Sequence, residues 1–393
     1  MPSYFSRLFG AKTAARVPEA KASRTASMVA MHGPSRARWT PRTNEALTRE
    51  GYERNAIVYR AVRMIAEAAA SVPWVAYDGD SEVADHPLLK TLSAPGGNQT
   101  AETLLEQLYT NLMLFGDAYL EAVTLDGIVR EIYALRPDRM SLVPGRNGWP
   151  EAYEYTVGGE RMRFAMNQEG LKPILHLKLF HPLDDFYGFA PMQAAQVALD
   201  IHNAAGAWNK ALLDNSARPS GALVYGAGGT MTDDQFDRLK SELDESFSGT
   251  RNAGRPLLLE GGLDWKSMSL SPKDMDFQEA KAAAAREIAL AFGIPPLVLG
   301  LPGDNTFSNY KEANRVFWSQ TILPLVSRTQ KSIAAWLTPA FGAVRLDYNA
   351  DRIDALSVDR EAEWRRVMNA SCLTRDEQRA ALGYGPLPPN TNL

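Results

Sequence analysis

Few residues of this 393-residue chain have the types and spacing that catalysis needs. The five histidines are scattered, and the single cysteine, Cys372, has no nearby histidine or asparagine that would make it a nucleophile. His176 and His181 could reach one metal ion, but lone histidines beside a strand are far more often structural. Asp184-Asp185 precedes a glycine-containing turn and is interpreted as solvated. The sequence therefore predicts no catalytic residue, no cofactor and no metal site.

A nucleotide-driven motor would need a phosphate loop, which this chain lacks. That loop reads Gly-x-x-x-x-Gly-Lys-Ser/Thr and holds phosphates with its backbone N–H groups. The glycine-rich stretch 226–229 has neither the lysine nor the preceding strand and following helix, so we interpret it as a turn. Acidic residues with the spacing of nuclease metal ligands are also missing. The sequence thus predicts a protein that is not an enzyme.

Charge divides the chain into two unlike parts. Residues 1–49 carry nine Lys and Arg against two acidic residues, and the remainder carries 33 basic against 44 acidic residues. An acidic body argues against a protein that grips DNA, because tight binders neutralise phosphates with Lys and Arg. It is compatible with a protein past which DNA slides. No stretch approaches the roughly 18 apolar residues of a membrane-spanning helix, so no membrane partner is expected.

The first 50 residues favour a disordered basic arm, because they are rich in Ala, Ser, Arg and Pro and lack sustained periodicity. Met1–Met28 also resembles a mitochondrial transit peptide, being basic and poor in acidic residues. The arm therefore leaves open a different class of protein, an organellar enzyme with a transit peptide.

The first ordered region is expected to be α+β. Asn55 fits the N-cap of a helix with one apolar face, and a second helix should end at Gly116. Strands are expected at Trp74–Tyr77 and at Ile174–Lys178. Between them, two hairpins should turn at residues 126–127 and 158–159. This pattern predicts a meandering antiparallel sheet.

Long helices dominate the second half. Pro191 through Asp214 reads as one proline-initiated helix, and another runs from about Asp276 to Phe292. The segment between them, 221–270, reads as a compact αβ insertion. A third helix spans roughly Lys311–Leu337, and Pro324 should kink it because proline removes a backbone donor. A strand at 343–348 and C-terminal helices complete the chain.

The order of these elements, together with several short strings, resembles the portal proteins of long-tailed phages, in the compact branch with subunits of about this length. The sharpest strings are Glu287-Ile288-Ala289, Phe292-Gly293-Ile294-Pro295-Pro296, Leu299-Gly300, Thr306-Phe307-Ser308-Asn309, Phe317 and Thr321-Ile322-Leu323-Pro324. Weaker strings are Gly116-Asp117-Ala118-Tyr119, Leu175-His176-Leu177-Lys178, Tyr187-Gly188-Phe189-Ala190-Pro191, Ala217-Arg218-Pro219 and Leu373-Thr374-Arg375-Asp376-Glu377. Their colinear order over some 320 residues carries the resemblance. Prophage and gene transfer agent relatives look alike at this level.

The resemblance implies a dodecameric ring built from a portal fold with named parts. These are the arm (1–50), an antiparallel-sheet wing (51–186), stem helix 1 (187–220), the clip (221–270), stem helix 2 (271–293), the tunnel loop region (294–312), a kinked wing helix and strand (313–356) and a helical crown (357–393). Twelve helices about 10 Å apart would lie on a circle of roughly 38 Å diameter. Subtracting one helix thickness leaves a lumen of roughly 28 Å, which admits one DNA duplex.

Two groups of residues are implied to meet partners. The tunnel loop is expected to contact DNA through Asp304, Asn305, Thr306, Phe307, Ser308, Asn309, Tyr310 and Lys311. The clip is expected to dock partner proteins through Asp233, Asp234, Asp237, Arg238 and Lys240. Short polar groups can hydrogen-bond phosphate oxygens and release them easily. Pro324 would be the hinge that lets the loop move.

The implied function is a portal, or head-to-tail connector, at one capsid vertex of a virion that assembles in the cytoplasm of a bacterial host. The expected partners are eleven further copies, double-stranded DNA bound transiently without sequence specificity, the major capsid protein, the terminase large subunit and a head-tail adaptor. A non-channel capsid scaffold or adaptor remains the second alternative.

Overall fold

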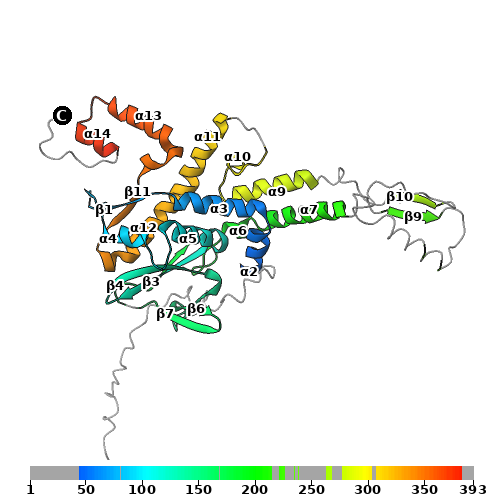
Figure 1. Cartoon of the computed structure of the whole chain (residues 1–393), viewed down its shortest axis with the longest axis horizontal. Helices are drawn as coiled ribbons and strands as arrows, with labels where there is room; N and C mark the ends of the chain where they lie inside the picture. Colours follow the sequence, from blue (N-terminus) through cyan, green and yellow to red (C-terminus); the bar gives the residue numbers. More distant parts are fainter. Residues whose placement is uncertain are drawn as a thin grey trace, which may run out of the picture.

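The computed structural model describes residues 44–79, 81–167, 169–214, 221–225, 234, 238, 263–267, 277–302 and 307–382. A mixed helical and sheet body occupies one side of the molecule, and two helices project from it (Figure 1). The expected α+β class is therefore confirmed. The predicted arm, residues 1–50, lies outside the described residues up to position 43.

Helical structure begins earlier than the sequence predicted. Helix α2 (Asn44–Leu47) and a π-helical turn (Thr48–Glu53) precede α3 (Ala56–Ala70). Leu47 and Gly51 are buried, and a Cβ on Gly51 would lie 2.6 Å from the Met192 methyl group. Residues 44–50, assigned to the arm from composition, are thus ordered by tertiary packing. Composition could not show this contact with a distant segment.

Helix α5 (Ala101–Phe115) packs against α3 and forms the centre of the body with it. Its N-cap is Thr100, whose hydroxyl accepts from the Thr103 N–H, and it ends at Gly116 with φ 76°. A left-handed residue at this position favours glycine, as predicted. The short helix α4 (Pro87–Ser93), which begins at a proline, was not predicted.

The described strands of the body are antiparallel, as predicted, but they form three separate three-stranded sheets, so the prediction of a single meandering sheet was wrong. One sheet has the order β4–β3–β8, from Ile128–Leu135, Asp117–Leu125 and Ile174–Lys178. A second has the order β5–β6–β7, from Met140–Pro144, Pro150–Val157 and Glu160–Ala165. A small apolar cluster that includes Tyr119, Met140 and Tyr155 lies between them. Strand β8 pairs with β3, where its Leu177 and Ile174 are buried. The two strands are far apart in sequence, so the hairpin turns alone do not determine this pairing.

The third sheet joins distant parts of the chain. Strand β1 (Trp74–Asp78) pairs with β11 (Arg345–Tyr348) on one side and with the short β2 (Ser81–Glu82) on the other. Trp74 lies opposite Tyr348, and Ala76 lies opposite Leu346. Both Ala76 and Leu346 are buried in the main core. This pairing joins the first described strand of the body to its last described strand.

The two projecting helices are α7 (Gln196–Asp214) and α9 (Phe277–Ala291), which lie side by side (Figure 1). The helix predicted over 191–214 is broken, because α6 (Pro191–Ala194) is a separate turn that ends at Ala195. Beyond α7 and α9 the antiparallel strands β9 (Gly221–Tyr225) and β10 (Leu263–Ser267) pair with each other. The helix predicted within the insertion lies outside the described residues, apart from positions 234 and 238.

The helices that follow α9 return to the body. They are α10 (Pro296–Leu299), α11 (Phe307–Val316), a π-helical turn (Phe317–Ile322) and α12 (Leu323–Phe341). The chain ends with two 3-10 turns, then α13 (Ser357–Met368) and α14 (Arg375–Ala381). A capping box between Thr374 and Glu377 starts α14, which gives a physical reason for the Thr-Arg-Asp-Glu string.

Candidate functional site

The paired helices α7 and α9 are the feature that extends farthest from the body among the described helices (Figure 1). Small side chains such as Ala198, Ala205 and Ala284 are buried on the two helices, and Leu199 and Ile288 belong to the main core cluster of the body. Alanines let helix axes approach closely and lose little side-chain entropy on packing. The pair therefore forms a stiff two-helix unit, which we call the stem.

A polar cluster fastens the base of the stem to the body. The Asn55 side chain is 2% exposed, and its Oδ1 accepts from the N–H groups of Ile57 and Val58 at 3.0 and 3.1 Å. Its Nδ2 donates to Asn203 Oδ1 at 2.8 Å and lies 3.0 Å from His202 Nδ1. Because the two backbone donors fix the amide orientation, His202 Nδ1 must be the acceptor. The sequence predicted the cap, but nothing local indicated its partners on α7.

This cluster should make the base of the stem sensitive to acid. Burial lowers the pKa of His202 below its ordinary value of 6.5, and the ammonium of Lys281 lowers it further. The unfolded chain therefore binds this proton more readily, so stability should fall as the pH drops below about 6.5. Protonation would also place an N–H against the Asn55 amide donor. When the pH is lowered from 7 to 5, the melting temperature should fall less for His202→Gln than for the wild-type chain, because glutamine keeps an acceptor but does not titrate. Equal decreases in the two proteins would contradict this role.

The turn after α9 positions the chain that leads to the predicted tunnel loop. Gly293 has φ 67°, and its carbonyl accepts from Thr321 Oγ1 at 2.6 Å. Arg286 Nη2 donates to the Pro302 carbonyl at 2.7 Å, which holds the start of the loop against α9. Gly300, with φ 85°, ends α10. The Gly-Ile-Pro-Pro string thus ties the stem to the π-helical turn that contains Thr321.

The structure divides the predicted DNA-contacting residues into two groups. Asp304, Asn305 and Thr306 lie outside the described residues. The segment from Phe307 through Lys311, which includes Ser308, Asn309 and Tyr310, forms the first turns of α11. The loop expected over 301–310 is therefore shorter than predicted, because Ser and Asn favour the first turn of a helix as well as loops. Asn309, Tyr310 and Lys311 are exposed.

The irregular part of the long helix lies just before Pro324. The Leu323 N–H donates to the Trp318 carbonyl, five residues back, which is the π-helical pattern. Pro324 then takes one of the first two positions of α12, where its missing donor costs least. The proposed hinge at Pro324 thus coincides with a local change in hydrogen bonding. Wide π turns often mark functional positions in helices.

Of the predicted clip residues, the structure describes two. Asp234 and Arg238 are helical and exposed, and their spacing of four places them on one helix face. Asp233, Asp237 and Lys240 lie outside the described residues. The clip therefore stays a prediction for its individual side chains.

His176 takes part in a buried hydrogen bond with Asp117 within the body. Its Nε2 lies 2.7 Å from Asp117 Oδ1, and both side chains are more than nine-tenths buried. The same carboxylate oxygen accepts from the Gly188 N–H at 2.9 Å. The ring stacks on Tyr119 with centroids 4.3 Å apart. His176 is thus structural, and no group of three or more His, Cys, Asp or Glu in the described residues could hold a metal ion.

Asp184 and Asp185 were predicted to be solvated, but both take part in hydrogen bonds within the chain. Asp184 Oδ1 accepts from the N–H groups of Phe186 and Tyr187 at 2.8 and 3.0 Å. The Asp185 carbonyl accepts from the Lys178 ammonium. Asp184 therefore shapes the loop that leads into α6, instead of being only solvated.

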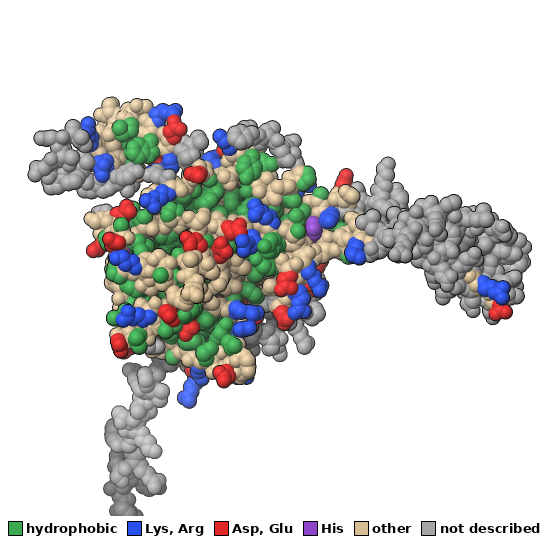
Figure 2. Space-filling view, viewed as in Figure 1, with side chains coloured by type: hydrophobic (Ala, Val, Ile, Leu, Met, Phe, Trp, Pro, Cys, Tyr) green, Lys and Arg blue, Asp and Glu red, His purple; other side chains and the backbone are tan. Residues whose placement is uncertain are grey.

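Charges of both signs are interspersed over the described part of the face shown in Figure 2. Many are paired, for example Arg163 with Glu151 and Arg315 with Glu312, both at 2.5 Å. Such exposed pairs contribute little to stability. On this face the described surface presents no extended basic patch of the kind that grips nucleic acid.

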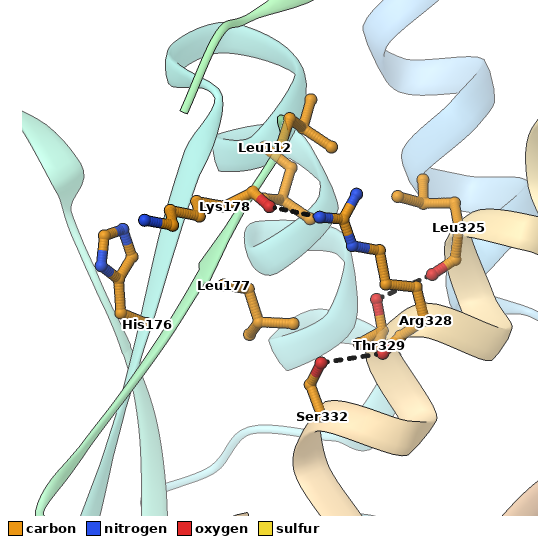
Figure 3. A pocket seen from close by; sticks show the side chains of 9 residues that line it. Leu112, His176, Leu177, Lys178, Leu325, Arg328, Thr329 and Ser332 are labelled. Atoms are coloured by element: carbon orange, nitrogen blue, oxygen red, sulfur yellow. Dashed lines mark hydrogen bonds between the residues drawn. The ribbon is translucent and has the colours of Figure 1, made fainter. Parts of the chain in front are cut away.

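A pocket of about 190 Å³ separates the edge of β8 from α12 (Figure 3). Side chains of α12 bind backbone carbonyls along this edge. Arg328, which lines the pocket, donates from Nη2 to the Lys178 carbonyl at 2.9 Å, and farther along α12 Trp336 Nε1 donates to the Lys172 carbonyl at 2.7 Å. Ser332, midway between them, lines the pocket. These contacts cover a sheet edge that would otherwise be open. We therefore assign to this pocket and its lining the role of covering the open edge of the sheet at β8.

No described helix is long and apolar enough to cross a membrane.

Comparison with known proteins relates the chain to one family. The family described as "Phage portal protein" matches residues 56–383. An uncharacterized protein of Rickettsia bellii is 40% identical over 349 residues, covering 88% of this chain and 90% of that protein. The portal protein of Enterobacteria phage HK97 is 25% identical over 349 residues, covering 84% of this chain and 79% of that protein.

Solved structures show the same similarity in three dimensions. A chain in the structure titled "Neck of native GTA particle computed with C12 symmetry" has 48% sequence identity and a TM-score of 0.70. The match covers 93% of this chain and 100% of that chain. GTA stands for gene transfer agent.

Proposed function

This chain belongs to the phage portal protein family, a family of structural proteins, and from that membership we propose that it forms a twelve-subunit ring through which double-stranded DNA enters and leaves a capsid. The observation that carries the proposal is the stem. A stiff two-helix unit projects from the body, and a similar chain occurs in a neck with twelvefold symmetry. Twelve such units around an axis can enclose a lumen wide enough for one duplex. The mixed charge of the described surface favours sliding over gripping.

The structural parts then take the following roles. The three-stranded sheets with α3, α5 and α12 form the wing, α7 and α9 the stem, and β9 with β10 the base of the clip. The chain from Leu301 to α11 brings the tunnel loop to the lumen, and α13 with α14 form the crown. The support is the order of elements along the chain and their placement in Figure 1.

We further propose that the particle is a phage virion or gene transfer agent, with the ring at one capsid vertex. Assembly in a bacterial cytoplasm would bring the ring together with the major capsid protein, then the terminase large subunit, and later a head-tail adaptor. The family match over residues 56–383 favours this interpretation over an organellar enzyme and over a non-channel scaffold.

Electron microscopy of the purified full chain tests the ring directly. The expected result is a closed ring with a central hole and close to twelve subunits, and mass photometry of the same sample should give a matching mass. Only monomers and dimers across the accessible concentration range would contradict the proposal.

Reversing two clip charges should separate ring formation from partner docking. We expect Arg238→Glu with Lys240→Glu to leave rings intact and to reduce DNA-filled particles several-fold, because like charges across an interface weaken association. Arg130→Glu, an exposed reversal on β4 in the body, serves as the matched control. Counting filled particles by electron microscopy decides the matter. A normal yield from the double variant would mean that these charges only solvate the helix.

A further inference from the structure

The loop between β8 and α6, residues 179–190, presents large apolar side chains to solvent. We call it the root loop, because it leads into the base of the stem. Leu183 is 83% exposed and Phe180 is 78% exposed, and Leu183 has the highest value among the large hydrophobic side chains that the structure describes. Single exposed apolar residues are common, but two large ones on a short loop mark an interaction surface.

Hydrogen bonds within the root loop hold it in one conformation. His181 Nδ1 accepts from the Leu183 N–H at 3.0 Å, and the His181 ring meets Phe189 edge-on at 5.3 Å. Asp184 accepts from two backbone N–H groups, as described above. The exposed side chains therefore extend from a shaped loop.

Further contacts fix the root loop to the body. The Gly188 N–H donates to the buried Asp117 carboxylate, and the Leu142 N–H donates to the Tyr187 hydroxyl at 3.1 Å. Phe186 packs edge-on against Trp149 at 5.8 Å. A loop ordered before any partner arrives loses little entropy on binding. Such preorganised apolar side chains are typical anchors of protein interfaces.

We propose that the root loop is the docking surface for the next copy of this chain in the ring, with Phe180 and Leu183 as its anchors. This inference rests on the proposed ring. A cyclic ring joins two unlike flanks of each subunit, so one flank must offer anchors that the other receives. The root loop supplies such anchors on the body.

A second pair of exposed apolar side chains lies on the stem, close to the root loop in sequence, and the two groups together identify the partner. Val197 is 70% exposed and Ile201 is 43% exposed, and their spacing of four places both on one face of α7. Only the short helix α6 separates them from the root loop. A partner that covers both the body loop and the stem face must itself have a body and a stem. A neighbouring copy has both, whereas a protein bound only at the clip would reach neither.

Mass photometry of the full chain tests the anchors. We expect Phe180→Ser with Leu183→Ser to raise the subunit concentration for half-assembly at least about tenfold, since truncating anchor residues has effects of this size. The melting temperature of the unassembled chain should stay unchanged because both side chains are exposed. Leu125→Ser with Met162→Ser, two exposed apolar residues on hairpins of the body, is the matched control and should assemble normally.

Three results would overturn the inference in distinguishable ways. If the wild-type chain forms no ring, the proposed function fails and the docking surface with it. If the double variant assembles at the wild-type concentration, the root loop is not a subunit contact although the ring stands. If its rings form normally but filled particles are lost, the root loop serves another protein.

Photo-crosslinking gives a readout that does not depend on assembly strength. Phe180→p-benzoylphenylalanine in the assembled ring should produce a product with twice the subunit mass. The same group at Leu125 should not. Absence of that product from position 180 in intact rings would contradict docking between copies.

Discussion

Replacing Gly188 with alanine should lower the free energy of unfolding by about 3 kcal/mol or more, a large share of the stability of an ordinary domain. A Cβ at this position would lie 2.0 Å from the Gly116 carbonyl oxygen and 3.0 Å from the Leu179 nitrogen. Both are backbone atoms, and the Leu179 N–H already donates to that same carbonyl at 2.8 Å. No side chain can rotate away to relieve the overlap. Urea unfolding followed by tryptophan fluorescence measures the loss.

Gly206→Ala is the matched control for this substitution. Gly206 lies within α7, and a Cβ there meets nothing within 4 Å. Alanine is the better helix former by about 1 kcal/mol, so the control should raise stability slightly. If the free energy of unfolding falls for Gly188→Ala and rises for Gly206→Ala, Gly188 is required for the close approach of the two backbone segments. A loss below about 1 kcal/mol for Gly188→Ala would mean that the backbone moves apart at little cost.

Replacing Asp304–Thr306 with Gly-Ser-Gly should lower the DNA retained in mature particles several-fold while the ring still forms. We expect the Asn305 amide and the Thr306 hydroxyl to donate to phosphate oxygens in the lumen, and twelve copies would repeat each contact around the duplex. Phe307 is left unchanged because α11 begins there, so the helix start is preserved. Retained DNA is measured by nuclease protection in purified particles, with ring mass measured in parallel.

The control for the loop replacement is Asp126→Asn, a change in the exposed turn between β3 and β4. Asn also adopts the positive φ of 52° found there, so particles should retain full-length DNA. If the loop variant retains as much DNA as this control, the segment neither grips nor gates the duplex. A loss of the ring itself would instead indicate a contact between subunits.

Local signals in the sequence predicted local structure well. Asn55 caps α3, Gly116 ends α5, and the turns at Asp126-Gly127 and Gly158-Gly159 join their hairpins as expected. Each depends on one or two residues whose own conformation or side chain makes the feature. The order of these elements also carried the family resemblance, which the comparisons confirmed. Stem, clip and tunnel loop residues stay predictions.

The sequence did not predict the contacts between distant segments. The arm boundary was placed too late because Gly51 packs on Met192 and Leu199, and Asn203 donates to the Glu50 carbonyl, both far along the chain. The hydrogen bond between Asp117 and His176 likewise joins segments with no local signal. The same holds for the bonds from Arg328 and Trp336 to backbone carbonyls. Strand β8 could have been placed after β7 or beside β3. Its buried Ile174 and Leu177 lie on opposite faces and pack in different apolar clusters, and only this packing decides. One sequence does not fix such pairings.

The pairing of β1 with β11 also determines when a newly made chain can complete its fold. Trp74 is synthesised long before its partner Tyr348, which lies 274 residues further along the chain. At typical rates of synthesis, tens of seconds separate the two. During that interval the β11 side of β1 stays open, and an open strand edge readily pairs with the wrong strand. A chain terminated before residue 345 keeps that edge for its lifetime, so a segment synthesised much later governs whether β1 is safely paired.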